Sequence, residues 1–285
     1  MKAKKPSILL TSSENNNAIE QALDAYNKLE SRGYSLILDD HLALKIVDNN
    51  LLDNKTDFDI VMVFGGDGAI LKTYSKWADK PILGVNCGKV GFLTEIVPNE
   101  IDEIVEKLDR ELYFIEECNT VEVSTKAFST LTGANDVVVS STKVGQTIRL
   151  IVKINDQHLY TLVGDGVVVA SSVGSSAYSR SAGGSLIMPS IDALIVVPIC
   201  PFLGRFDSMV VSPNTKITIK NIGKYRSCAV TIDGQTYYTL GHNETIDVTG
   251  SKIPIKFIRF SERYVQRVKE KLLHINPEMY DEPHE

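Results

Sequence analysis

The sequence predicts an α/β region with a parallel sheet, followed by an all-β region of the sandwich or barrel type. Up to about residue 112, apolar runs of strand length alternate with segments of helical periodicity, which is typical of a parallel sheet with helices on both faces. From residue 113 to 260, runs rich in β-branched residues follow one another and helical periods are few. A chain of 285 residues is long enough for two domains.

The first region opens with a strand and an amphipathic helix. The helix is expected over Asn16–Arg32, with Ile19, Leu23 and Tyr26 on one face and Gly33 as its stop. The other expected elements of this region are strands at 7–10, 34–38, 59–64 and 81–85, a helix at 69–77, and a helix whose face is made by Ile101, Ile104, Leu108 and Leu112. This alternation indicates a parallel sheet.

The second region holds a series of short β-branched runs separated by turn signals such as Asn155-Asp156 and Asp233-Gly234. The expected strands lie at 120–125, 136–140, 147–154, 166–170, 194–198, 216–220 and 253–260. After them, apolar residues at spacing four predict a last helix, carried by Phe260, Tyr264, Val268 and Leu272. We therefore expect domains at 1–112 and 113–260, with a helix at about 261–285 that docks on the first domain.

Composition narrows the class of protein. A net charge of −6 and a pI near 5.5 argue against a nucleic acid or a membrane surface as the main partner. The sequence shows no signal-peptide pattern and no apolar stretch near 18 residues, so a cytoplasmic protein is expected. The four cysteines are scattered and the five histidines do not cluster with them, so no metal site built from side chains is predicted.

The most informative motif is Phe64-Gly65-Gly66-Asp67-Gly68, directly after the apolar run at 60–63. Glycines allow a phosphate to approach the backbone closely, and a helix that starts after the turn directs its free N–H groups to the same place. An aspartate there repels phosphate, so its presence favours metal binding or proton abstraction and hence phosphoryl transfer. The alternative is a tight turn with Asp67 as the helix N-cap.

Three further segments carry polar or glycine-rich patterns. The loop at 86–93 follows the next strand, which would bring it to the same sheet edge as the first turn, and its Phe92 is either core or the wall of a nucleotide pocket. Asn135-Asp136 offers an amide for a base edge and a carboxylate for ribose hydroxyls, or is a polar strand entry. The segment at 164–184 joins small hydroxyl residues, glycines and Tyr178, which would let backbone amides surround a ligand.

Taken together, these segments and the late Asp233-Gly234 resemble the NAD kinase family. That family carries, in the same order, a Gly-Gly-Asp-Gly turn, a Gly-x-Asn-x-Gly-x-x-Gly-Phe-Leu loop, an Asn-Glu/Asp pair, a long Asp-Gly…Ala-Tyr…Ala-Gly-Gly segment and a late Asp-Gly. The resemblance covers roughly residues 60–240. The Gly-Gly-Asp-Gly turn also occurs in diacylglycerol-type lipid kinases and phosphofructokinases, whereas the segment at 174–178 is more specific.

The resemblance implies a Rossmann-like α/β domain, a β-sandwich domain, and transfer of the ATP γ-phosphate, with Mg²⁺ or another divalent cation, to the 2′-hydroxyl of the adenosine ribose of NAD. It also implies residue roles. Asp67 would be the catalytic acid/base, and the phosphates of ATP would meet Gly65, Gly66, Gly68 and Arg205. NAD would be bound by Asp67, Gly68, Phe92, Asn135, Asp136, Asp165, Ser176, Ala177, Tyr178 and Ser181.

The sequence departs from the family pattern at Ala69, where threonine is usual, and at Val173, where a hydroxyl is usual. These departures leave room for a second interpretation, a non-catalytic protein that senses NAD or NADP. A third is a lipid kinase on a related scaffold, which would need an apolar groove in place of the hydroxyl-rich segment. The family resemblance further suggests a homodimer or homotetramer.

Overall fold

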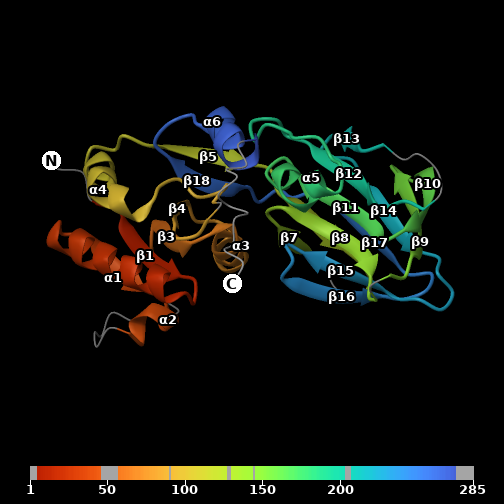
Figure 1. The fold of residues 1–285 in the computed structure, drawn as a ribbon, viewed down its shortest axis with the longest axis horizontal. Helices are drawn as coiled ribbons and strands as arrows, with labels where there is room; N and C mark the ends of the chain where they lie inside the picture. The colour runs from red at the N-terminus through yellow and green to blue at the C-terminus, as the bar shows by residue number, and fades with distance from the viewer. Residues whose placement is uncertain are drawn as a thin grey trace, which may run out of the picture. The chain divides into compact units, whose positions relative to one another are not determined.

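The structure is a computed structural model that describes residues 5–45, 57–89, 91–126, 130–143, 145–202 and 207–273. The chain divides into two compact units. Unit 1 comprises residues 1–116 and 256–285, and unit 2 comprises residues 117–255 (Figure 1). Unit 1 is therefore built from both ends of the chain, whereas unit 2 is one continuous segment.

Unit 1 contains a six-stranded sheet in the order β2-β1-β3-β4-β18-β5. β1 pairs in parallel with β2 and β3, and β4 pairs in parallel with β3 and β18. Its strands are β1 (Ser7–Ser12), β2 (Ser35–Leu38), β3 (Ile60–Gly65), β4 (Ile82–Asn86), β5 (Phe114–Cys118) and β18 (Ile255–Arg259). Its helical segments are α1 (Asn16–Ser31), α2 (Asp40–Ala43), α3 (Asp67–Lys76), η1 (Pro98–Glu100), α4 (Ile101–Asp109), α6 (Tyr264–Val268) and the π-helical η3 (Lys269–Leu273).

Helices cover both faces of this sheet. α1 and α4 bury their apolar residues in one cluster with side chains of β1, β3 and β4, among them Leu83 and Val85. Gly84 lies between these two residues and so faces the other side of the sheet. A Cβ built on Gly84 would lie 2.7 Å from Cδ1 of Ile70, which places α3 on that opposite face. The predicted doubly covered parallel sheet is thus confirmed.

Unit 2 contains two six-stranded sheets, in the orders β10-β9-β14-β17-β6-β7 and β13-β12-β11-β8-β15-β16. The strand pairs within them are antiparallel throughout the described residues. The strands are β6 (Val121–Ser124), β7 (Leu131–Gly133), β8 (Asp136–Ser141), β9 (Ile148–Ile154), β10 (Gln157–Gly164), β11 (Gly166–Ser171), β12 (Leu194–Ile199), β13 (Met209–Val211), β14 (Ile217–Asn221), β15 (Cys228–Ile232), β16 (Thr236–Leu240) and β17 (Thr245–Gly250). Two short helices, η2 (Gly174–Ser176) and α5 (Tyr178–Ser181), follow β11.

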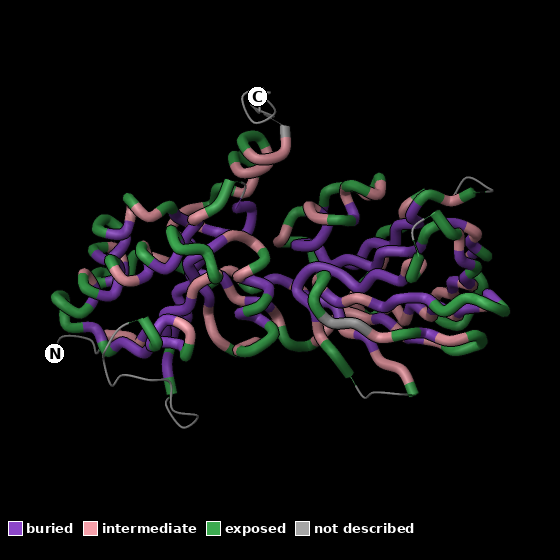
Figure 2. Tube along the Cα trace, turned by 60° about the horizontal axis from the view of Figure 1, so that its bottom comes forward, coloured by how far each residue is buried: buried purple, intermediate pink, exposed green. Residues whose placement is uncertain are grey.

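The core of unit 2 lies between its two sheets. Alternate residues of facing strands, such as Val137 and Val139 of β8 with Val121 and Val123 of β6, form one buried cluster. The remaining side chains of β8, β11 and β12 face outward from this core and form a second cluster with Ile187 and residues near it. Strands in the middle of the sheets, such as β3, β4, β11 and β12, are buried along their whole length, whereas strands such as β9 and β10 alternate between buried and accessible residues (Figure 2). This two-sheet arrangement confirms the predicted β-sandwich.

Two predicted elements differ from the structure. The helix expected to include Leu112 ends earlier, with α4 stopping at Asp109, because Glu111 takes a positive φ of 55° and leaves Leu112 57% exposed. The run at 253–260, grouped by sequence with the all-β region, forms β18 in the sheet of unit 1, where Phe257 pairs in parallel with Ile82. Local periodicity identifies a strand but does not specify its distant partner.

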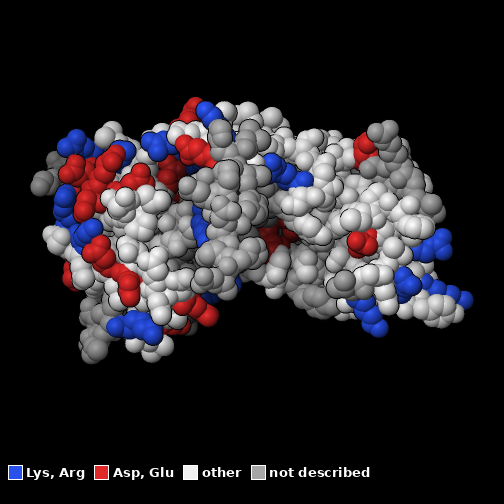
Figure 3. All heavy atoms as spheres, in the orientation of Figure 1, with Lys and Arg blue, Asp and Glu red and all other residues white. Residues whose placement is uncertain are grey.

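The described residues show how charge is distributed over one face of the protein and whether any helix could cross a membrane. On the face shown in Figure 3, acidic and basic side chains intermingle over unit 1, and most of the visible surface of unit 2 is uncharged. None of the helices in the described ranges combines the length and hydropathy of a membrane-spanning segment.

Candidate active site

The glycine-rich turn joins β3 to α3. β3 ends at Gly65, Gly66 is the N-cap of α3 without a side-chain capping bond, and Asp67 is the first helical residue. The alternative in which Asp67 caps the helix is therefore not the arrangement that forms. Its carboxylate is free to make contacts beyond its own helix.

Asp67 binds the loop that follows the neighbouring strand. Its Oδ2 accepts a hydrogen bond from the backbone N–H of Phe92 at 3.0 Å, and its Oδ1 accepts one from the N–H of Leu93 at 2.9 Å. β3 and β4 are parallel neighbours, so the two glycine-containing loops lie at one sheet edge as the sequence predicts. The two amides fix the plane of the carboxylate.

The three glycines of the turn differ in what the fold requires of them. A Cβ built on Gly65 would lie 2.7 Å from the Cβ of Ala69, so only glycine fits there. A Cβ on Gly66 or Gly68 would meet nothing within 4 Å. The fold alone does not explain these two glycines, and both leave open space beside the N-terminus of α3.

Phe92 is 8% exposed, and its ring packs edge-on against Tyr264 of α6, with ring centroids 5.8 Å apart. The C-terminal helix thus contacts the loop that binds Asp67. This contact corresponds to the core interpretation of Phe92, and a role against a ligand stays a prediction.

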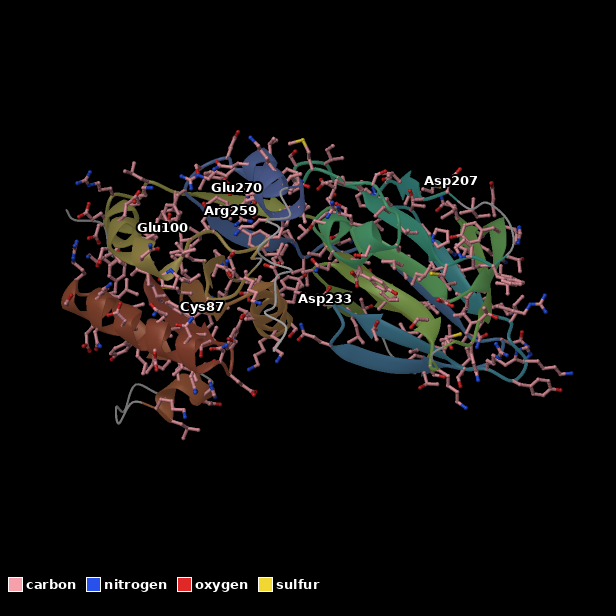
Figure 4. The ribbon with its side chains drawn as sticks, in the orientation of Figure 1. Cys87, Glu100, Asp207, Asp233, Arg259 and Glu270 are labelled. Atoms are coloured by element: carbon pink, nitrogen blue, oxygen red, sulfur yellow. The ribbon has the colours of Figure 1, made fainter. Side chains whose placement is uncertain are left out.

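In unit 2, Asn135 and Asp136 stand at the start of β8 and are held by Asp233 (Figure 4). The Asp233 carboxylate accepts hydrogen bonds from three successive backbone N–H groups, those of Ala134 at 2.7 Å, Asn135 at 2.7 Å and Asp136 at 3.1 Å. Asp233 also opens the tight β15–β16 connection, with positive φ at Asp233 and Gly234, so the predicted hairpin is confirmed. The turn signal does not indicate that the Asp233 carboxylate also binds the backbone before β8.

The electrostatics of this group are unusual. Burial first, and then the nearby charge of Asp233, raise the pKa of Asp136 to about 7. Burial also raises the pKa of Asp233, although its three amide donors act in the opposite direction. The side-chain Oδ1 of Asn135 is buried and has no hydrogen-bond partner among the described residues. An amide oxygen in this condition is suited to a ligand that donates a hydrogen bond.

The serine-rich segment packs directly on Asn135. A Cβ built on Gly174 would lie 2.0 Å from the carbonyl oxygen of Asn135, so the turn at η2 requires glycine. Ser171 Oγ donates to the Ala134 carbonyl at 2.6 Å, and Ser175 Oγ donates to the Ser172 carbonyl at 2.6 Å. These hydroxyls are satisfied within the protein. Of the predicted ligand-binding residues in this segment, Ser176 and Ala177 are half-buried, and Asp165, Tyr178 and Ser181 are exposed.

Tyr178 links the remaining predicted residues. Its pKa is raised by burial first and then by Cys200, Asp165 and Asp136, so these groups lie near its hydroxyl. Within unit 2 the structure therefore brings together Asn135, Asp136, Asp165, Ser176, Ala177, Tyr178 and Ser181. Within unit 1 it brings together Gly65, Gly66, Asp67, Gly68 and Phe92. Arg205 lies outside the described residues.

Comparisons with known proteins agree with this arrangement. The ATP-NAD kinase N-terminal domain matches residues 12–113, and the ATP-NAD kinase C-terminal domain matches residues 134–260. The NAD kinase of Thermoplasma acidophilum is 31% identical over 238 residues, covering 83% of this chain and 87% of that protein. The chain belongs to the NAD kinase family. The resemblance inferred from the motifs is thus confirmed.

Two solved structures share the fold of this NAD kinase family member. Yeast NADH kinase complexed with NADH superposes with a TM-score of 0.82 at 22% identity, covering 95% of this chain and 88% of that one. An NAD kinase from Archaeoglobus fulgidus in complex with ATP gives a TM-score of 0.72 at 24% identity, covering 93% and 98%. Both units therefore have the architecture of the family.

The structure also accounts for one departure from the family pattern. Val173 is 3% exposed, so its side chain belongs to the interior and not to an accessible surface. Ala69 is half-buried and would be the neighbour of any side chain at position 65.

Two contacts of this region join residues that are distant in sequence. The Asp233 carboxylate binds backbone groups about 97 positions away, and Arg259 reaches the carbonyl of Leu93 across 166 positions. The sequence marks Asp233 as a turn and as the late Asp-Gly of the family pattern, whereas the patterns considered above give no signal for Arg259.

Proposed function

We propose that this NAD kinase family member transfers the γ-phosphate of ATP to the 2′-hydroxyl of the adenosine ribose of NAD, producing NADP. The observation that carries the proposal is Asp67, a carboxylate held by two backbone amides at a helix N-terminus whose glycines leave open space. The comparisons match NAD kinase domains in both halves of the chain, and nothing in them favours a lipid kinase or a sensor.

Asp67 is proposed as the general base. A ribose hydroxyl is a weak nucleophile at neutral pH, and a carboxylate within hydrogen-bond reach assists by taking its proton. Each oxygen of Asp67 accepts one amide bond, and a carboxylate offers about four lone-pair sites, so acceptor capacity remains for the hydroxyl. Such assistance is typically worth about 10²–10⁴ in rate.

The phosphates of ATP are proposed to lie against Gly65, Gly66 and Gly68, where the amides at the start of α3 point, with Arg205 as a further contact. The described residues hold no group of three or more His, Cys, Asp or Glu side chains arranged for a metal. Mg²⁺ or another divalent cation, arriving with ATP and ligated mainly by its phosphates, would offset the repulsion between the triphosphate and Asp67.

The adenosine of NAD is proposed to bind in unit 2. The side-chain amide of Asn135, whose Oδ1 has no hydrogen-bond partner among the described residues, would contact the adenine edge. The carboxylate of Asp136 would accept hydrogen bonds from ribose hydroxyls. Tyr178, 45% exposed, offers a stacking face. Ser176, Ala177 and Ser181 would line the same pocket, Asp165 would contact the nicotinamide-side ribose or amide, and Phe92 would supply an apolar contact.

We also propose that the chain forms a homodimer or homotetramer through unit 2 in the cytoplasm. Large apolar side chains are exposed on the edge strand β13, namely Met209 and Val210, and in the segment between α5 and β12, namely Leu186, Met188 and Ile191. Exposed apolar groups beside an unpaired strand edge are typical of surfaces that associate, and a second copy of the chain is the occupant proposed here.

The test is to incubate the purified protein with NAD⁺, ATP and Mg²⁺ and to follow NADP⁺ with a coupled NADP-specific dehydrogenase. Asp67→Asn is expected to retain NAD binding and to lose turnover by about 10²–10⁴. Asp79→Asn, which alters a carboxylate in unit 1 that is 76% exposed, serves as the matched control and should keep its activity. Near-wild-type kcat in Asp67→Asn would rule out Asp67 as the base.

A further inference from the structure

The loop at residues 91–95 sets the orientation of Asp67. Within the described residues, the backbone donors to this carboxylate are the N–H groups of Phe92 and Leu93. A shift of the loop would therefore rotate the carboxylate or break one of its two bonds. The position of Asp67 therefore depends on the contacts that hold this loop from the side opposite to Asp67.

Arg259, the last residue of β18, binds the loop at 91–95 (Figure 4). Its Nη1 donates to the Leu93 carbonyl at 3.0 Å and to Glu95 at 3.1 Å, and its Nε donates to Glu116 at 2.8 Å. The side chain is 5% exposed and lies over the ring of Phe257 at 4.4 Å. Leu93 thus donates to Asp67 and accepts from Arg259, which joins the two side chains through one residue.

Glu95 anchors the same loop a second time. One carboxylate oxygen accepts from Arg259 and from Arg267 of α6 at 2.9 Å, and the other accepts from the backbone N–H of Phe260 at 3.0 Å. The Glu95 side chain is 4% exposed, so its attraction to the guanidinium groups of Arg259 and Arg267 is little screened by solvent. Removal of one partner from such a buried group leaves an uncompensated charge.

Packing alone does not hold this loop. A cavity of about 160 Å³ lies beside it, lined among others by Gly91, Thr94, Glu95 and Arg267. A loop that borders empty space on one side can relax into it when its polar contacts are removed. Backbone hydrogen bonds from Glu95 and Ile96 to the Gly84 carbonyl hold the far end of the loop, and the guanidinium of Arg259, which spans three acceptors in a rigid fork, is the side chain that binds the Leu93 carbonyl within the described residues.

We propose that Arg259 is a positioning residue for phosphoryl transfer, which fixes the carboxylate of Asp67 through the loop at 91–95 without touching a substrate. This inference rests on the proposed function, since it takes Asp67 as the base. It assigns the end of β18, which comes from the C-terminal segment of the chain, a role in orienting Asp67.

The central variant is Arg259→Lys. Lysine keeps the positive charge between Glu95 and Glu116, which favours folding, but its single ammonium cannot reproduce the fork that reaches Leu93. We expect kcat for NADP⁺ formation to fall by about 10²-fold, the loss associated with a misplacement of about 1 Å. The KM values for NAD and ATP should stay near those of the wild type.

Arg267→Met is the matched control. It removes a second buried guanidinium from Glu95 but leaves the bond between Arg259 and the Leu93 carbonyl in place. We expect it to lower thermal stability while keeping most of kcat. Should Arg267→Met lose as much kcat as Arg259→Lys, the effect would be general loosening of the ion-pair cluster, and the proposal would be overturned.

Amide hydrogen exchange gives a readout that needs no activity. In Arg259→Lys, exchange at Phe92 and Leu93 should be faster than in the wild type, while amides of the sheet core, such as those of β3, stay protected. Unchanged exchange at both amides, whatever the kcat, overturns the proposal. If the wild-type protein forms no NADP⁺, the proposed function fails by itself, and the exchange experiment still decides whether Arg259 holds the loop.

Discussion

At the residue scale, Asp136 is expected to make stability depend on pH. Its pKa in the folded protein is about 7 against an ordinary value of 3.8, so the folded state keeps a proton that the unfolded chain releases. The stability that this proton confers is full below about pH 4 and is lost as the pH rises through 7. Asp136→Asn, which resembles the protonated form, should lack this dependence.

The measurement is urea unfolding of the wild type and of Asp136→Asn at pH 5 and pH 8. Between these values the wild type is expected to lose on the order of 2 kcal/mol relative to the variant. A wild type whose free energy of unfolding follows that of the variant at both pH values would contradict the raised pKa. Asp207→Asn, an exposed acid of unit 2, serves as a control for changes in net charge.

The same residues show how far single side chains can be predicted. The amide and carboxylate of Asn135 and Asp136 before a β-branched run fit either a ligand site or a polar strand entry, and it is the family resemblance that makes them NAD-binding candidates. The burial that raises the pKa of Asp136, and the clamp from Asp233, arise from the pairing of β8 with β15. That pairing brings together residues distant in sequence, and no local pattern encodes it.

At the element scale, the turn between β3 and α3 predicts opposite effects for two of its glycines, Gly68 and Gly65. Gly68→Ala places a methyl group in open space at the start of a helix, so stability should be unchanged or higher by up to about 1 kcal/mol. The methyl group would stand where the ATP phosphates are proposed to lie. The KM for ATP is therefore expected to rise about tenfold, equivalent to about 1.4 kcal/mol.

Gly65→Ala is the contrasting variant, because its methyl group would meet the Cβ of Ala69 at 2.7 Å. Overpacking of this kind costs about 1–3 kcal/mol, so its Tm should fall. Thermal unfolding and the coupled NADP⁺ assay on both variants distinguish the two effects. A stable Gly68→Ala protein with an unchanged KM for ATP would argue against phosphate binding at this turn.

The elements themselves follow closely from local sequence. The predicted strand at 59–64 and helix at 16–32 match β3 and α1 to within a residue or so, because periodicity and the stop at Gly33, with φ of 76°, are local signals. The helix α4 is shorter than predicted because the apolar residue Leu112 fits the helical spacing but follows a left-handed Glu111. Spacing alone does not distinguish a buried residue from an exposed one.

At the scale of the whole molecule, the chain leaves unit 1 at residue 116 and returns to it at residue 256. The returning strand β18 takes a place between β4 and β5, inside the sheet and not at its edge. Phe257 and Ile258, each 1% exposed, fill the two faces of the sheet at that point. Unit 1 therefore depends on the last part of the sequence, whereas unit 2 has its own strands and core in one continuous segment.

This difference predicts how fragments of the chain behave. Residues 117–255, expressed alone, are expected to fold into a sandwich with a cooperative thermal transition, because both sheets and the core between them lie in that segment. Residues 1–116 alone would leave β4 and β5 without the strand that separates them, and an unpaired apolar edge favours aggregation. Joining residues 256–273 to residue 116 through a Gly/Ser linker should restore cooperative unfolding, because it returns β18 and the Arg259 contacts. Circular dichroism on heating tests all three fragments. A soluble, cooperatively unfolding 1–116 fragment would show that β18 is an addition to the unit 1 sheet and not a requirement for it.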